Sequence, residues 1–136
     1  MSAMEKVAWT EFLISLTAAG LAAAAVPWIG NAALGFFGLL GFVVAGAWFL
    51  RGGRDKVLVD ERDREIDRRS IFLGVLAAWL TLFIGLFTVV MWNGGEPGTK
   101  VSITPLLWLL WVQIAVSFGV KGATAILSYR GQRHAS

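Results

Sequence analysis

The sequence contains no cysteine and a single histidine, His134, close to its C-terminal end. The first absence excludes a disulfide framework, thiol catalysis and any cysteine-ligated metal. The second excludes multi-histidine metal sites and histidine-based catalytic triads. No nucleophile–base pair or metal cluster is evident elsewhere. We therefore expect a protein without enzymatic activity, metal or cofactor.

Charged residues are also scarce. They make up 15% of the 136 residues, whereas hydrophobic residues make up 57% and the mean hydropathy is +0.68. A soluble domain carries about a quarter charged residues, and a chain of this length cannot bury so much apolar surface in its own core. Lipid is the solvent that fits. The basic pI of about 9.8 then indicates the positive-inside bias of a membrane protein, with lipids and no nucleic acid as partners.

A membrane-spanning helix needs about 20 predominantly apolar residues. Four stretches qualify, at residues 7–29, 31–50, 70–92 and 105–128. They form one domain over residues 1–136, with a charged linker at 51–69 and an outer loop at 93–104. Gly30-Asn31 predicts a tight turn between the first two spans. The fold class that we predict is an all-α, integral membrane four-helix bundle, whose C-terminal residues 129–136 fray.

The basic residues predict the orientation. Ten of them lie at the ends assigned to the cytoplasm: Lys6, Arg51, Arg54, Lys56, Arg62, Arg64, Arg68, Arg69, Arg130 and Arg133. The opposite ends hold only Lys100, and Lys121 lies inside a span. Under the positive-inside rule both termini and the linker are cytoplasmic, so we expect a multi-pass protein of the inner membrane.

Small residues predict where the helices pack, because helices in lipid associate through close contact rather than through a hydrophobic drive. The fourth span carries Ala115-xxx-Gly119-xxx-Ala123, and the second carries Gly38, Gly41 and Ala45 on one side. On the third span the small residues share one face and the large aromatic residues lie on the others. Some of these faces could instead join two copies in a homo-oligomer.

Polar residues inside the spans are the first candidates for function. They are Glu11 and Ser15 in the first span and Gln113, Ser117, Lys121 and Thr124 in the fourth. The simpler interpretation is structural: Glu11 pairs with Lys121, or Lys121 extends to the lipid headgroups. The alternative is a proton or cation site in which a desolvated Glu11 exchanges protons. Small multidrug transporters resemble this chain in having four helices and a glutamate in the first, but they have no long charged linker.

The charged linker is the second candidate. Its densely charged part is Asp60, Glu61, Arg62, Asp63, Arg64, Glu65, Asp67, Arg68 and Arg69. Oppositely charged residues recur three and four positions apart, which predicts a helix continuous with the third span. We interpret it as a surface that docks a protein or binds lipid headgroups. Asp60, Asp63 and Asp67 share a face and could hold a divalent cation, although interleaved arginines are more typical of a solvated, self-paired helix.

The run Asp60-Glu61-Arg62-Asp63, followed by Ile66, Arg69 and Ser70, resembles a family of small, uncharacterised prokaryotic membrane proteins, a domain of unknown function. The resemblance covers about a dozen residues. It implies a four-helix membrane protein and supplies no reaction, substrate or catalytic residue.

Together these features predict a non-enzymatic membrane protein, an interaction or accessory subunit of a larger membrane complex that acts through its charged cytoplasmic helix. The alternative is a small proton-coupled transporter that uses Glu11, with Lys121 and the polar side of the fourth span along its path.

Overall fold

The structure is a computed structural model that describes residues 3–43 and 61–135, and every regular element in these ranges is a helix. The elements are α1 (Ala3–Ile29), the 3₁₀ helix η1 (Gly30–Leu40), α3 (Glu61–Trp92) and α4 (Ile103–Ala135). Residues 41–43 continue η1 as α-helix. The all-helical class predicted from the sequence is confirmed for this part of the chain.

Within the described residues, three stretches are long and apolar enough to cross a membrane: Met4–Val43, Glu61–Trp92 and Ile103–Ala135. The large side chains on α3 that the sequence assigned to lipid, Phe72, Trp79, Phe83 and Phe87, are 57–70% exposed. So many exposed aromatic rings on one helix are unusual for a protein in water but ordinary for one in lipid. Length, composition and surface therefore agree on a membrane protein.

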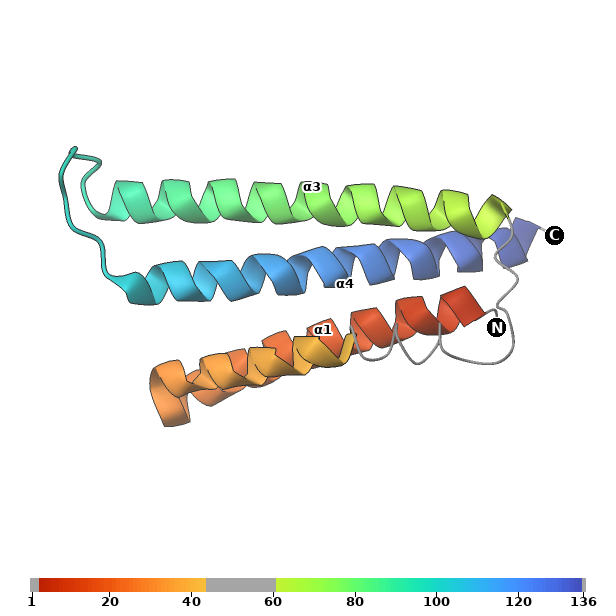
Figure 1. Cartoon of the computed structure of the whole chain (residues 1–136), viewed down its shortest axis with the longest axis horizontal. Coiled ribbons are helices and arrows are strands. Elements are labelled where there is room, and N and C mark those ends of the chain that lie inside the picture. The colour runs from red at the N-terminus through yellow and green to blue at the C-terminus, as the bar shows by residue number, and fades with distance from the viewer. Residues whose placement is uncertain (1–2, 44–60, 136) are drawn as a thin grey trace.

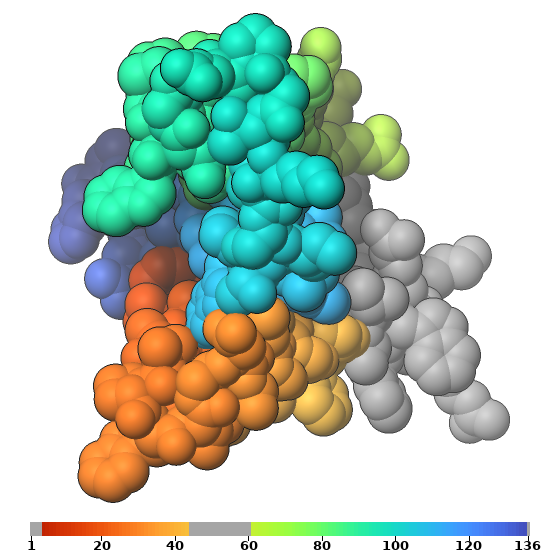
Figure 2. Space-filling view, turned by 90° about the vertical axis from the view of Figure 1, so that its left-hand side faces the viewer, coloured from red at the N-terminus to blue at the C-terminus, as the bar shows by residue number. Residues whose placement is uncertain are grey.

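Helix α4 lies between the other elements and contacts α3, α1 and η1 (Figure 1). The chain reverses direction after α1 at Gly30, whose φ of +58° is the left-handed conformation that glycine accepts readily. The loop at residues 93–102 reverses it again between α3 and α4. From that end, Figure 2 shows the loop and the α1–η1 turn on opposite sides of the start of α4.

Both ends of the chain and the start of α3 lie at one end of the molecule (Figure 1). We call this the basic end and define it as residues 3–11, 61–70 and 121–135. The two reversals, at Gly30 and at residues 93–102, lie at the other end. The structure thus gathers on one side the described segments in which the sequence concentrates its basic residues.

Helix η1 covers the first part of the predicted second span; residues 44–50 of that span lie outside the described residues. Its sequence repeats every three residues, and Phe37, Leu40 and Val43 form the buried row. In a 3₁₀ helix residues three apart eclipse one another, and glycines at 35, 38 and 41 remove that crowding from one row.

The glycine row of η1 does not make the close contact that the sequence predicted. Gly38 and Gly41 are exposed, and no atom of the described chain lies within 4 Å of a Cβ built on either. The buried side chains of η1 occupy the inner face instead, because a large apolar row buries more surface against α1 and α4 than glycine does. Ala45, the third member of the predicted face, lies outside the described residues.

Two helix boundaries bear on the functional candidates. Helix α3 begins at Glu61, so the charged segment is continuous with the third span from that residue, as predicted, while residues 51–60 lie outside the described residues. Helix α4 runs to Ala135, so the prediction of a frayed C-terminal tail was wrong. Tyr129 and Arg133 hold the last turns by binding Asp63 and Glu5.

Candidate functional site

Two glycines, one in the basic end and one just beyond it, bring α1 and α3 close to α4. A Cβ built on Gly122 would lie 2.8 Å from the backbone oxygen of Ala8 and 2.8 Å from the backbone nitrogen of Phe12. A Cβ built on Gly74 of α3 would lie 2.7 Å from the backbone oxygen of Ser117. Neither position has room for a side chain, so both helices approach α4 through backbone contact.

The sequence located this α4 interface only in part. In the predicted ridge, Ala115 is buried and Gly119 lies near Ser15, but the closest approach is at Gly122, one residue before Ala123. The buried face of α4 follows spacings of four and three residues through Ala115, Gly119 and Gly122 rather than a strict spacing of four. This is the ordinary period of a helix packed along its length.

An ion pair joins α1 and α4 beside these contacts. The Lys121 Nζ lies 2.9 Å from the Glu11 Oε1 and donates a hydrogen bond to it, which confirms the predicted pairing. The same Nζ is 3.9 Å from the Asp67 Oδ1 on α3. The exposed fractions of the side chains are 8% for Glu11, 23% for Lys121 and 39% for Asp67. One ammonium group thus faces a buried carboxylate and a more exposed one.

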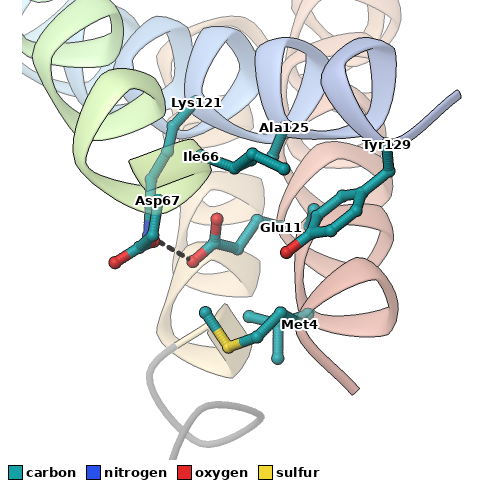
Figure 3. A pocket seen from close by; sticks show the side chains of 9 residues that line it. Met4, Glu11, Ile66, Asp67, Lys121, Ala125 and Tyr129 are labelled. Carbon is teal, nitrogen blue, oxygen red and sulfur yellow. Dashed lines mark hydrogen bonds and ion pairs between the residues drawn. The ribbon is translucent and has the colours of Figure 1, made fainter. Parts of the chain in front are cut away.

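Figure 3 shows these three side chains pointing toward one another in a small pocket. The rest of its lining is mostly apolar: Met4, Val7, Ala8, Ile66, Ala125 and Tyr129. It offers about 20 Å³ of space to a water-sized molecule, and a single water needs 10–15 Å³ on the same measure. The pocket therefore has room for about one water molecule, and an organic substrate would require the helices to move apart.

Helix α4 contacts carboxylates of both neighbouring helices. The Tyr129 hydroxyl donates a hydrogen bond of 2.7 Å to the Asp63 Oδ1 on α3. The Arg133 guanidinium binds the Glu5 Oε2 on α1 at 2.5 Å, and Glu5 is nearly fully buried. With Lys121, α4 supplies donors or cations to Glu5 and Glu11 on α1 and to Asp63 and Asp67 on α3. A buried carboxylate is costly without such partners, so these contacts hold the three helices together.

Sequence reasoning missed Glu5, Asp67, Tyr129 and Arg133 as parts of this arrangement. A signal for Glu5 was present, because the buried face of α1 repeats at spacings of three and four residues: Glu5, Ala8, Glu11, Ser15, Ala18 and Ala22. Small residues on that face predict a packed side. A glutamate in line with them is therefore placed among helices, where it needs a partner.

Within the described residues, the structure gives the other predicted polar side chains no hydrogen bond to the Glu11–Lys121 pair. The Ser15 hydroxyl is buried and has no hydrogen-bond partner within the described residues. Thr124 uses its backbone oxygen to accept a hydrogen bond from Ser128. Gln113 is half-buried and lies about 12 Å along α4 from Lys121 at 1.5 Å per residue. The Ser117 backbone oxygen and the Lys121 Cβ both lie against α3 at Gly74.

The charged start of α3 has two different sides. Arg62, Asp63 and Asp67 turn toward α4, where Arg62 donates a hydrogen bond to the Gln132 side chain. Among the other exposed residues of this segment, Arg64, Glu65, Arg68 and Arg69 have no charged partner in the described ranges. Glu61 is also exposed. We call Glu61, Arg64, Glu65, Arg68 and Arg69 the outer face of α3.

The predicted aspartate triplet is not assembled in the described structure. Asp60 lies outside the described residues, Asp63 accepts a hydrogen bond from Tyr129, and Asp67 lies near Lys121. Across residues 3–43 and 61–135, no three histidine, cysteine, aspartate or glutamate side chains gather in a way that could hold a metal ion.

Comparisons of this chain with protein-family models, curated proteins and solved structures find no match. The resemblance of the charged run to uncharacterised membrane proteins therefore depends on that run alone, and any function must be argued from the site.

Proposed function

We propose that this chain is a non-enzymatic, multi-pass inner-membrane protein that acts as an interaction or accessory subunit, with a four-helix bundle as its membrane domain. Its N- and C-termini and the outer face of α3 lie in the cytoplasm in this proposal. The outer face carries Glu61, Arg64, Glu65, Arg68 and Arg69. It is the surface through which the chain meets a partner protein.

The observation that carries this proposal is that one side of α3 is bonded to α4 while the other side is exposed. Asp63 is bonded to Tyr129 and Ile66 is buried against α4, so the helix cannot rotate freely about its axis. Arg64 and Glu65 project from the same turns without a charged partner in the described ranges. Charges of both signs in a fixed arrangement favour one partner over others more than they add raw affinity.

A charge exchange that keeps the net charge tests this surface. We expect Arg64→Glu combined with Glu65→Arg to abolish co-purification of the partner in mild detergent from native membranes. The surface would keep its net charge but present the charges in the wrong order, and opposed like charges cost several kcal/mol at an interface, on the order of a hundredfold in affinity. The measurement is quantitative mass spectrometry of the proteins that elute with the tagged chain.

The loop at the other end of the molecule offers a matched control. Glu96→Lys combined with Lys100→Glu makes the same exchange between two exposed residues, and it should leave the partner bound. Retention of the partner by the α3 exchange, or equal loss in both variants, would contradict the proposed role of the outer face.

A second function is favoured by one observation. Glu11, Lys121 and Asp67 bring three charges from three helices to a pocket with room for water, which is the kind of place where a membrane protein exchanges a proton. In this alternative the chain is a small proton-coupled transporter that uses Glu11. Lys121 would pair with Asp67 whenever Glu11 is protonated.

The alternative predicts a loss of transport. If it holds, Glu11→Gln removes the exchangeable proton, so substrate-driven proton movement into vesicles containing the reconstituted protein should fall at least tenfold. Asp67→Asn should reduce it less, because Asp67 is the more exposed carboxylate. A pH-sensitive dye inside the vesicles measures the movement. Unchanged proton movement in Glu11→Gln would contradict the transporter and leave the interaction subunit as the proposed function.

A further inference from the structure

At the basic end, most basic side chains are exposed and most acidic side chains are not. Its described ranges contain eight basic residues, seven of them exposed: Lys6, Arg62, Arg64, Arg68, Arg69, Arg130 and Arg133. The same ranges contain six acidic residues, of which only Glu61 and Glu65 are exposed. The basic end, with eight basic and six acidic residues, therefore exposes seven basic and only two acidic side chains. Its surface is strongly positive because the other four carboxylates turn inward to α4.

Exposed bases lie on two separate flanks. Arg68 and Arg69 belong to the outer face of α3. On the other flank the Arg130 guanidinium lies 5.2 Å from the centre of the Trp9 ring on α1, a cation–π contact. Lys6 is three residues before Trp9 and so lies on the same side of α1. On an ideal helix Arg130 is about 160° from Gln132, the α4 residue that binds α3.

Both flanks lie where the apolar surface begins. Arg69 is followed after one residue by Ile71 and Phe72, which are 44% and 65% exposed. Trp9 has the amphipathic ring that membrane interfaces favour. The bases are thus at the depth of the lipid headgroups, and they occur on both sides of the molecule rather than on one face. A single protein partner would cover one flank, whereas lipids surround the whole chain.

We propose that the basic end binds anionic phospholipid headgroups through two clusters, Arg68 with Arg69 on α3 and Lys6 with Arg130 beside Trp9. Guanidinium groups bind phosphate oxygens through paired hydrogen bonds, and each base near an anionic surface adds about 1 kcal/mol of attraction. Arg68 and Arg69 also belong to the outer face proposed above to meet a partner protein, so the two proposals share this cluster. The exchange at Arg64 and Glu65 leaves both clusters intact, so it tests the partner separately from the lipid.

Spin-labelled lipids test the proposal on the full chain in phosphatidylcholine bilayers. The fraction of label held at the protein surface should show a preference of about threefold or more for phosphatidylglycerol over phosphatidylcholine. Arg68→Gln with Arg69→Gln should reduce this preference, as should Lys6→Gln with Arg130→Gln, and all four changes should bring it close to one. Raising the salt to 1 M should weaken the wild-type preference by screening.

Charge-preserving variants separate lipid binding from damage to the fold. Arg68→Lys with Arg69→Lys should keep most of the preference, since lysine still attracts phosphate as a point charge. Inorganic phosphate at constant ionic strength should not reduce it. Three results would overturn the proposal: no preference in the wild type, a full preference in the fourfold variant, or displacement of the lipid by free phosphate, which would indicate a site for soluble phosphate.

Discussion

Lys121→Met is expected to lower the free energy of unfolding by about 3 kcal/mol, because it leaves Glu11 buried without its cation. Glu11 is 8% exposed, and its Oε1 accepts a hydrogen bond from Lys121. Glu11→Gln should lower the same quantity by only about 1 kcal/mol. The amide oxygen can still accept from Lys121, and the lysine retains Asp67 at 3.9 Å and partial access to solvent. Titration of the detergent-solubilised protein with a denaturing detergent, followed by tryptophan fluorescence, measures both values.

The double variant makes this prediction sharper. Glu11→Gln combined with Lys121→Met removes both charges, so it should be more stable than Lys121→Met by about 2 kcal/mol. The coupling free energy of this double-mutant cycle reports the ion pair itself. A loss in the double variant that equals the sum of the two single losses would show that the pair does not join α1 to α4. Gln113→Leu, on the same helix and about 12 Å away, serves as the control.

Gly122→Ala is expected to destabilise the protein by about 2 kcal/mol through overpacking. The added Cβ would meet the backbone of Ala8 and Phe12 at 2.8 Å and the Phe12 Cβ at 2.9 Å. Backbone atoms cannot move aside as the end of a long side chain can, so α1 would have to separate from α4. That movement would also lengthen the Glu11–Lys121 contact, because Lys121 directly precedes Gly122 and Glu11 directly precedes Phe12. The unfolding titration described above measures the loss.

Two further glycines of α4 provide matched controls. Gly119→Ala should change the free energy of unfolding by less than about 0.5 kcal/mol, because the nearest atom, the Ser15 Cβ, is at an ordinary 3.8 Å. Gly131→Ala faces open space and should be neutral or stabilising by up to about 1 kcal/mol, the helix propensity difference. A larger effect at Gly119 than at Gly122 would favour the ridge predicted from the sequence over the interface in the structure.

The inner contacts fix the surface that we propose for a partner or for lipid. Helices α1 and α3 are each tied to α4 through carboxylates and through a glycine contact, so the surface that they present is held in one arrangement. A partner or a lipid shell then meets prearranged charges and does not have to order them on binding.

The sequence alone determined the class of this protein, because class depends on composition and on the length of apolar runs. An apolar run can be recognised without knowing what it packs against, so the first, third and fourth predicted spans lie within α1, α3 and α4, although α3 begins earlier and α4 ends later than predicted. The turn at Gly30 was also predictable, because a turn that needs glycine depends only on residues next to one another in the sequence. The pairing of Glu11 with Lys121 was one of the alternatives that the sequence left open, because it depends on whether α1 and α4 are neighbours, which the structure shows.

Only the tertiary structure decided which helices are neighbours. It therefore also decided which side chains are partners across the helix interfaces. The closest contact is made by Gly122 and not by Ala123 because of how α4 is rotated against α1. A rule based on the spacing of small residues does not fix this rotation to better than one residue. The way in which α3 meets α4 also decides which charged side chains are exposed. Asp63 and Asp67 turn inward, and Arg64 and Arg68 turn outward. The distribution of charge over the surface follows from the packing of whole helices, and no local pattern records it.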